Sequence, residues 1–106
     1  MELKGVVANK FDKEIKGICR IIFDEDINSF NKGEILVTES TSPRFLPAML
    51  KAKAIITEYG GLLSHSAITS REFNIPCIVN VKDATDILKD GDIIVLKQDG
   101  SVIWDE

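Results

Sequence analysis

Short apolar runs rich in β-branched residues alternate with polar stretches along the whole chain. Runs of this length and composition are typical of strands. They cover residues 3–9, 15–23, 34–40, 54–57, 77–79, 93–97 and 102–104. The first two runs are separated by a charged turn, which predicts a hairpin or a near neighbour of one. Asp99 and Gly100 between the last two runs are a strong hairpin signal.

Helical signals stand between these runs. Pro43 suits the first turn of a helix, and Phe45, Leu46, Met49 and Leu50 are spaced to cover one helical face. Ser64 is placed to cap a second helix, which Asn74 and Pro76 would stop. Residues 82–92 predict a further helical turn. The order fits neither a regular βαβ alternation nor an all-β pattern, so we expect a mixed α/β fold, with one mixed sheet or two small sheets and short helices on one side.

Composition narrows the classes of protein to consider. A chain of 106 residues with 44% hydrophobic residues predicts one soluble domain over residues 1–106. The net charge of −4, without clustered Lys and Arg, argues against a nucleic-acid partner. No stretch approaches a membrane span or a signal peptide, so we expect a cytoplasmic location and no membrane partner. Cys19 and Cys77 lie inside apolar runs, which predicts buried, reduced thiols, and no metal-ligand spacing is present.

The chain has one histidine, His65, which directly follows the proposed cap Ser64 and stands close after Gly60 and Gly61. The first N–H groups of a helix lack intrahelical partners and favour a bound anion, and glycines let the backbone approach it. An imidazole there can act as a general base or as a nucleophile that carries a phosphoryl group. A base would need a nucleophile and an orienting carboxylate, for which only Glu58 and Glu72 are close in sequence.

Two plainer interpretations stay open on these residues alone. A single histidine beside a glycine turn is often structural or merely exposed. A Ser–His hydrolase built on Ser64 or Ser66 is disfavoured, because neighbours on one short turn rarely provide nucleophile-to-base geometry and no orienting acid is evident.

A longer stretch, TEYGGLLSHSAITSREFNIPCIV, carries a more specific pattern. It resembles the signature of the phosphohistidine swivelling domain of phosphoenolpyruvate (PEP)-utilising enzymes, which include pyruvate phosphate dikinase, phosphoenolpyruvate synthase and antibiotic phosphotransferases. The resemblance extends over residues 33–104, with Thr41 and Pro43 in the preceding block and Asp90, Gly91 and Asp92 in the closing block. The residues that match the signature are Thr57, Gly60, Gly61, Ser64, His65, Ala67, Ile68, Arg71, Glu72, Ile75, Pro76 and Val79.

The resemblance implies a swivelling β/β/α domain and a phosphotransferase component. His65 would be the catalytic residue that accepts and donates a phosphoryl group, and Gly60, Gly61 and the helix start would hold the phosphate. Ser64 would contact the phosphate or cap the helix. Arg71 lies about two turns further on, so an electrostatic and a structural role both stay open.

The chain also departs from the family pattern at three positions. Leu63 stands where the dikinase type has threonine, which removes any contact or regulation through that hydroxyl. Asn74 and Asn80 stand where glycine is common in the family. Asparagine tolerates left-handed backbone angles, so we expect Asn74 still to close the helix.

The chain has no Gly-rich nucleotide loop and no acidic cluster for Mg²⁺, so we expect no cofactor in it and no complete reaction by it alone. The resemblance implies an ATP-grasp nucleotide-binding domain and a domain for PEP, pyruvate or another acceptor as partners, with Mg²⁺ and ATP bound there. These partners would act in trans or within a longer parent chain, and the initial methionine slightly favours a free-standing protein. The alternative function is a binding or regulatory module that keeps the fold and has lost transfer.

Overall fold

The computed structural model describes residues 2–105. Its strands are β1 Glu2–Lys4, β2 Val6–Asn9, β3 Ile15–Ile21, β4 Ile35–Thr38, β5 Ala54–Thr57, β6 Cys77–Val79, β7 Ile93–Leu96 and β8 Ser101–Trp104. The α-helices are α1 Leu46–Lys51, α2 His65–Glu72 and α3 Ala84–Ile87, and the 3-10 helices are η1 Asp24–Ser29 and η2 Pro43–Phe45.

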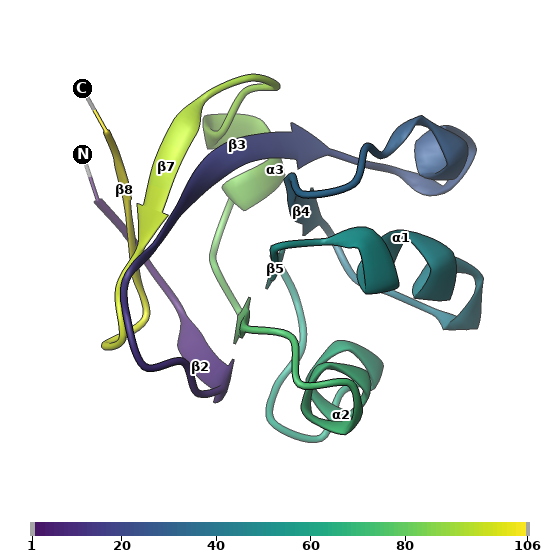
Figure 1. Ribbon diagram of the computed structural model, residues 1–106, viewed down its shortest axis with the longest axis horizontal. Helices are drawn as coiled ribbons and strands as arrows, with labels where there is room; N and C mark the ends of the chain where they lie inside the picture. The colour runs from purple at the N-terminus through teal and green to yellow at the C-terminus, as the bar shows by residue number, and fades with distance from the viewer. Residues whose placement is uncertain (1, 106) are drawn as a thin grey trace.

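The strands form one mixed sheet in the order β1-β8-β7-β3-β4-β5-β6-β2. Strands β3, β4, β5 and β6 run parallel to one another, while β7, β8, β1 and β2 pair antiparallel with their neighbours. The long strand β3 serves both regions, because residues 15–18 pair with β7 and residues 19–21 pair with β4. Figure 1 shows the resulting curvature, with β7 and β8 wrapping across one side of the parallel strands.

The N-terminal run closes this sheet. It bends at Gly5, so that β1 pairs with β8 at one edge and β2 pairs with β6 at the other. Gly5 donates its N–H to the carbonyl of Gly100, and a Cβ on Gly5 would come within 2.5 Å of the Val79 carbonyl oxygen. The expected hairpin between residues 3–9 and 15–23 is therefore wrong, because both edges of the sheet take up the first run.

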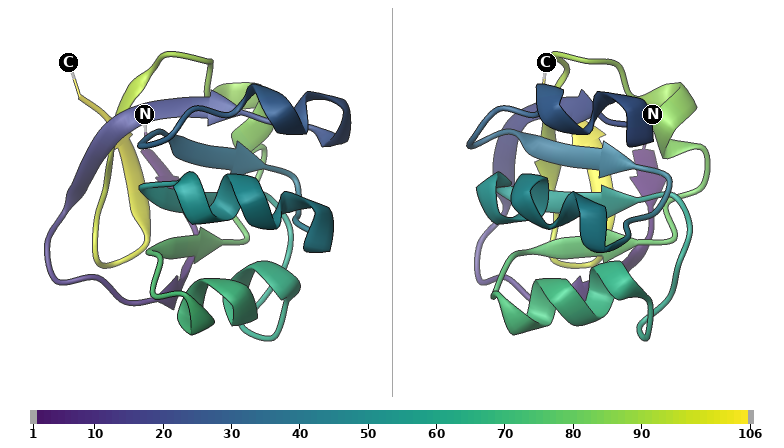
Figure 2. Two further views of the ribbon diagram at one scale, coloured as in Figure 1. Left: turned by 45° about the vertical axis from the view of Figure 1, so that its right-hand side comes forward. Right: turned by 90° about the vertical axis from the view of Figure 1, so that its right-hand side faces the viewer.

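Two apolar cores explain why the parallel strands are apolar throughout. Side chains alternate across a strand, so Ile35 and Val37 of β4 enter the core inside the curved sheet, while Leu36 enters the core beneath the helices. Met49 of α1 and Ala67 of α2 belong to the second core. Figure 2 shows η1, α1 and α2 together over this face of the parallel strands. The helices, the parallel strands and the antiparallel strands of the one curved sheet form three layers, which agree with the expected β/β/α fold.

Several predictions from the sequence are confirmed and one is partly wrong. Cys19 and Cys77 are free and buried, and Asn74 ends α2 with a φ of 55°. Pro43 begins a helical segment in which Phe45 and Met49 are buried, but Leu50 points outward and is 52% exposed. The predicted apolar face is therefore only partly buried. Within residues 2–105, no helix is long and apolar enough to cross a membrane.

Candidate functional site

The site lies where the parallel strands β4 and β5 end. Ligands in α/β sheets commonly bind beyond the carboxyl ends of such strands. The chain leaves β5 at Thr57, whose hydroxyl donates to the carbonyl of Tyr59 at 2.8 Å. It then turns at Gly60 and enters α2 at His65. The segment that follows β4 brings Thr41 to the same place, as the contacts of His65 show.

Ser64 caps α2. Its Oγ accepts the N–H of Ala67 at 3.3 Å and donates to the carbonyl of Gly61 at 2.8 Å. Both contacts stay within the loop and the first turn, so Ser64 fixes how the loop enters the helix. Of the two interpretations of Ser64, these contacts support the cap.

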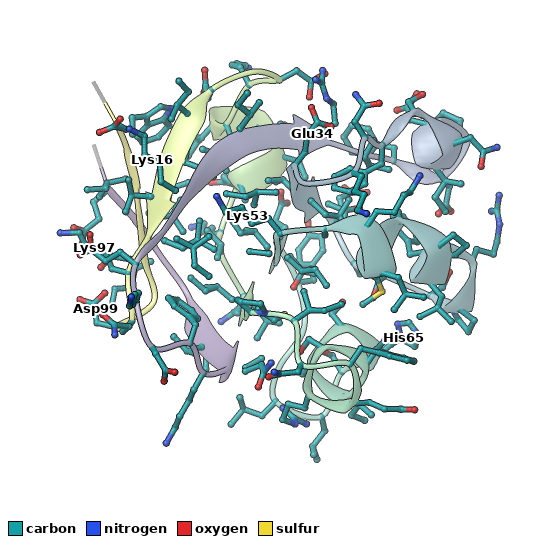
Figure 3. All side chains as sticks on the ribbon, viewed as in Figure 1. Lys16, Glu34, Lys53, His65, Lys97 and Asp99 are labelled. Carbon is teal, nitrogen blue, oxygen red and sulfur yellow. The ribbon has the colours of Figure 1, made fainter. Side chains whose placement is uncertain are left out.

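The imidazole of His65 lies between threonine hydroxyls. Nδ1 is 2.9 Å from Thr41 Oγ1, which is itself 2.5 Å from Ser66 Oγ. Nε2 is 3.4 Å from Thr69 Oγ1, one helical turn further along. The residue is half-buried, and Figure 3 shows it on the side of α2 nearer α1. The ring is therefore oriented through Nδ1, while Nε2 has only a long contact.

The two glycines of the loop differ. Gly60 has a φ of 112°, and a Cβ there would lie 3.0 Å from Ser64 Oγ. Gly61 does not have a positive φ, and a Cβ there would meet nothing within 4 Å. Within residues 2–105, the backbone N–H groups of residues 60–63, 65 and 66 have no hydrogen-bond acceptor. The loop and the helix start, where His65 is the first helical residue, thus offer free backbone donors.

Arg71 contacts backbone carbonyls and not the imidazole. Its Nη1 donates to the carbonyl of Ala8 on β2 at 3.0 Å, and its Nη2 donates to the carbonyl of Leu62 at 2.7 Å. No carboxylate of residues 2–105 forms an ion pair with it. Arg71 ties the loop to the sheet and adds a positive charge near it.

Neither candidate carboxylate orients the imidazole. Glu58 accepts two hydrogen bonds from Thr85, from its hydroxyl at 2.7 Å and from its N–H at 3.0 Å. The Thr85 hydroxyl bond holds the pKa of Glu58 below its usual range, so this carboxylate stays charged. Among residues 2–105 no side-chain carboxylate bonds to His65, and neither Ser64 nor Ser66 does. The arrangement lacks the orienting acid and the serine contact that a hydrolase needs.

The sequence does not reveal the two threonine partners of the imidazole or the serine behind one of them. Thr41 stands out in the sequence only as part of a turn, and its contact with His65 spans 24 positions. Ser66 contacts Thr41 and not the ring. Thr69 stands four positions after His65 on a predicted helix, and that spacing alone puts two side chains on one face. In the part of the chain that the structure describes, no group of three His, Cys, Asp or Glu residues is placed to hold a metal ion.

Comparison with known proteins adds a family match. Residues 30–100 match the family described as PEP-utilising enzyme, mobile domain. Phosphoenolpyruvate synthase of Pyrococcus furiosus is 51% identical over 72 residues, which are 67% of this chain and 9% of that protein. A probable phosphoenolpyruvate synthase of Archaeoglobus fulgidus is 40% identical over 90 residues, 84% of this chain and 12% of that protein. Rifampicin phosphotransferase of Bacillus cereus is 38% identical over 77 residues, 73% of this chain and 9% of that protein.

The chain therefore spans about a tenth of the length of these relatives. Solved structures share the fold. Aconitase X of Thermococcus kodakaraensis matches with a TM-score of 0.73 at 16% identity, over all of this chain and 99% of that one. The solution structure of Enzyme I matches with a TM-score of 0.62 at 24% identity, over 76% of this chain and 34% of that one.

Proposed function

Since the chain belongs to the mobile-domain family of PEP-utilising enzymes, we propose that it is a phosphoryl carrier whose acceptor is His65. The single observation that carries this proposal is the imidazole at the start of α2, held through Nδ1 at 2.9 Å from Thr41 Oγ1, on a helix start whose first backbone N–H groups are free. The acceptor atom is Nε2.

The Thr41 contact supports this choice of nitrogen. A neutral imidazole has one N–H and one lone pair. With the proton on Nδ1, the ring donates to Thr41 Oγ1, and the Thr41 hydroxyl can donate to Ser66 Oγ at 2.5 Å. The lone pair is then on Nε2, which is the nucleophilic atom. In this arrangement Thr41 and Ser66 would favour the reactive tautomer without a carboxylate.

The loop and helix start supply the complement for a phosphoryl group. The free N–H groups of residues 60–63, 65 and 66 and the positive end of the α2 dipole favour an anion beside His65. Gly60 and Gly61 are the phosphate-supporting glycines, Ser64 holds the entry to the helix, and Arg71 anchors the Leu62 carbonyl.

The placement of the described chain ends suits a mobile carrier. Strands β1 and β8 pair with each other, with Glu2 opposite Ile103, and Figure 1 shows both strands well away from α2. A pivot near the termini would swing His65 through a wide arc. We propose that residues 1–106 act as one carrier unit between an ATP-grasp nucleotide site and a site for PEP, pyruvate or another acceptor. Mg²⁺ and ATP would be bound by those partners, in trans or in a longer parent chain.

The test is chemical phosphorylation with phosphoramidate followed by ³¹P NMR. Wild type should give a phosphohistidine signal that is labile in acid and stable in base, and His65→Ala should give none while keeping its circular dichroism spectrum. A labelled alanine variant, or a folded wild type that takes no phosphoryl group, would overturn the assignment.

A second candidate function rests on the surface beside His65. Leu62 and Leu63 are 52% and 85% exposed. Such an apolar pair suits a binding or regulatory module that has lost transfer. In that case wild type would not become phosphorylated, and a partner would bind wild type and His65→Ala equally well.

A further inference from the structure

Thr69 has an unusual hydroxyl for a buried helical threonine. The residue is 8% exposed, and its Oγ1 lies 3.4 Å from His65 Nε2. Threonine in a helix often bonds back to the carbonyl one turn earlier. Within residues 2–105 the Thr69 hydroxyl has no partner except the imidazole. Ser70, its neighbour on α2, does bond back, to the Ala67 carbonyl at 2.9 Å.

The distance itself is informative. At 3.4 Å the hydroxyl lies beyond the usual length of a strong hydrogen bond to nitrogen. Because Thr69 Oγ1 lies 3.4 Å from Nε2, a phosphoryl group bonded to Nε2 would bring its anionic oxygens within reach of this hydroxyl. Hydrogen bonds to an ionised acceptor are shorter and roughly twice as strong as neutral ones. The hydroxyl is therefore better placed for the loaded histidine than for the empty one.

We propose that Thr69 is a further catalytic residue. Its hydroxyl contacts His65 Nε2 in the empty protein and donates a hydrogen bond to a phosphoryl oxygen when the histidine is phosphorylated. This inference rests on the proposed carrier function. In the loading step the Nε2 lone pair forms the N–P bond, while the bond from phosphorus to the donor's leaving group breaks and the leaving group keeps that electron pair. The proton stays on Nδ1, hydrogen-bonded to Thr41 Oγ1, so the ring carries the positive charge beside the anionic phosphoryl group.

The hydroxyl has a predictable effect on the loaded state. In phosphoryl transfer the transition state is loose, and charge on the phosphoryl oxygens spreads as the group departs. A hydroxyl that donates a hydrogen bond to those oxygens before the phosphoryl group departs stabilises the phosphohistidine. Removing the Thr69 hydroxyl should therefore shorten the life of the phosphohistidine by roughly tenfold, the effect of one hydrogen bond to a charged group.

The experiment compares hydrolysis of phosphohistidine in the purified chain after loading with phosphoramidate. Thr69→Val removes the hydroxyl and keeps the branched shape, Thr69→Ser restores the hydroxyl, and Ser70→Ala is the matched control on the same helix. The phosphohistidine should hydrolyse about tenfold faster in Thr69→Val than in wild type. In Thr69→Ser the rate should return most of the way to the wild-type value, and Ser70→Ala should hydrolyse at the wild-type rate. The ³¹P titration of the phosphoryl group should shift upward in pH for valine alone.

The outcomes separate this inference from the carrier proposal. Equal hydrolysis rates and titrations for wild type and Thr69→Val would overturn the role of Thr69 and leave His65 as acceptor. Equal effects of Thr69→Val and Ser70→Ala would also overturn it, because they would indicate a general loss of packing. Wild type that never loads would overturn both proposals. If Thr69→Val does not fold, Thr69→Cys, with a weak donor of similar size, takes its place.

Discussion

The adjacent glycines of the loop before α2 should respond in opposite ways to alanine. Gly60 has a φ of 112°, and its added Cβ would lie 3.0 Å from Ser64 Oγ and 3.1 Å from Ser64 Cβ. Holding a side chain in such a sparsely populated backbone region costs about 1–3 kcal/mol. Displacing the Ser64 cap adds about 1 kcal/mol. Gly60→Ala should therefore lower the free energy of unfolding by roughly 2–4 kcal/mol.

Gly61 provides the matched control. Its added Cβ meets nothing within 4 Å, and its φ is not in the left-handed region. Alanine there restricts the unfolded chain, so Gly61→Ala should leave stability unchanged or raise it by up to about 1 kcal/mol. Urea unfolding, followed by the fluorescence of the single tryptophan, measures both variants. With a slope of about 1.5 kcal/mol per M, Gly60→Ala should lower the midpoint of urea unfolding by roughly 1.3–2.7 M.

The same pair separates folding from phosphate binding. If the free N–H groups of the loop hold the phosphoryl group closely, a Cβ on Gly61 should slow phosphorylation by phosphoramidate in a protein that is otherwise stable. Equal stability losses at both positions, or none at Gly60, would refute the backbone argument. Full phosphorylation of Gly61→Ala would refute a close approach of the phosphate at that residue.

Three further outcomes are expected. Gly100→Ala should unfold the domain at lower urea than wild type, because Gly100 has a φ of 93° and its added Cβ would overlap the Gly5 carbonyl oxygen at the seam of the sheet. The Arg20 side chain bonds to Glu34 and lowers the pKa of this carboxyl. The stabilisation that Glu34 gains from this bond is present above the unfolded carboxyl pKa of about 4.3 and is lost as the pH falls through the lowered folded pKa. Glu34→Gln should therefore flatten the acid end of the plot of unfolding free energy against pH, measured by urea unfolding. Burial raises the pKa of Cys77 and of Cys19 to about 11, so iodoacetamide at pH 8 should alkylate both only after unfolding, as read by mass spectrometry; rapid labelling of the native protein would contradict this.

Local signals in the sequence predicted much of the local structure. The cap at Ser64 and the left-handed closure at Asn74 follow from side-chain chemistry within a few positions. The continuous apolar runs of β4, β5 and β6 follow from burial on both faces. Each of these features depends on neighbours in the chain, so the pattern of residues is enough to predict it.

The pairing of the N-terminal run could not be predicted in the same way. Residues 3–9 have the alternation of one strand, and only the tertiary structure divides them at Gly5 between two partners at opposite edges of the sheet. The glycine signals a close approach of backbone, but the partner, the Gly100 carbonyl, lies 95 positions away. Strand pairing over such separations depends on the whole set of competing edges.

The contacts of His65 likewise include some that the sequence could predict and some that it could not. Its position at a helix start was predictable from the cap, and Thr69 could have been found from helical spacing. Thr41 reaches the imidazole from another loop, and Arg71 turns back to the Ala8 and Leu62 carbonyls instead of facing the ring. Contacts between loops depend on how the parallel strands bring their ends together.

The acceptor atom itself can be observed directly. A long-range ¹H–¹⁵N spectrum of the ¹⁵N-labelled chain, recorded before and after loading with phosphoramidate, identifies the protonation and phosphorylation of each imidazole nitrogen. The account predicts a proton on Nδ1 throughout, held by Thr41, and phosphorus on Nε2 of His65 after loading. Phosphorus on Nδ1, or on any residue other than His65, would contradict it.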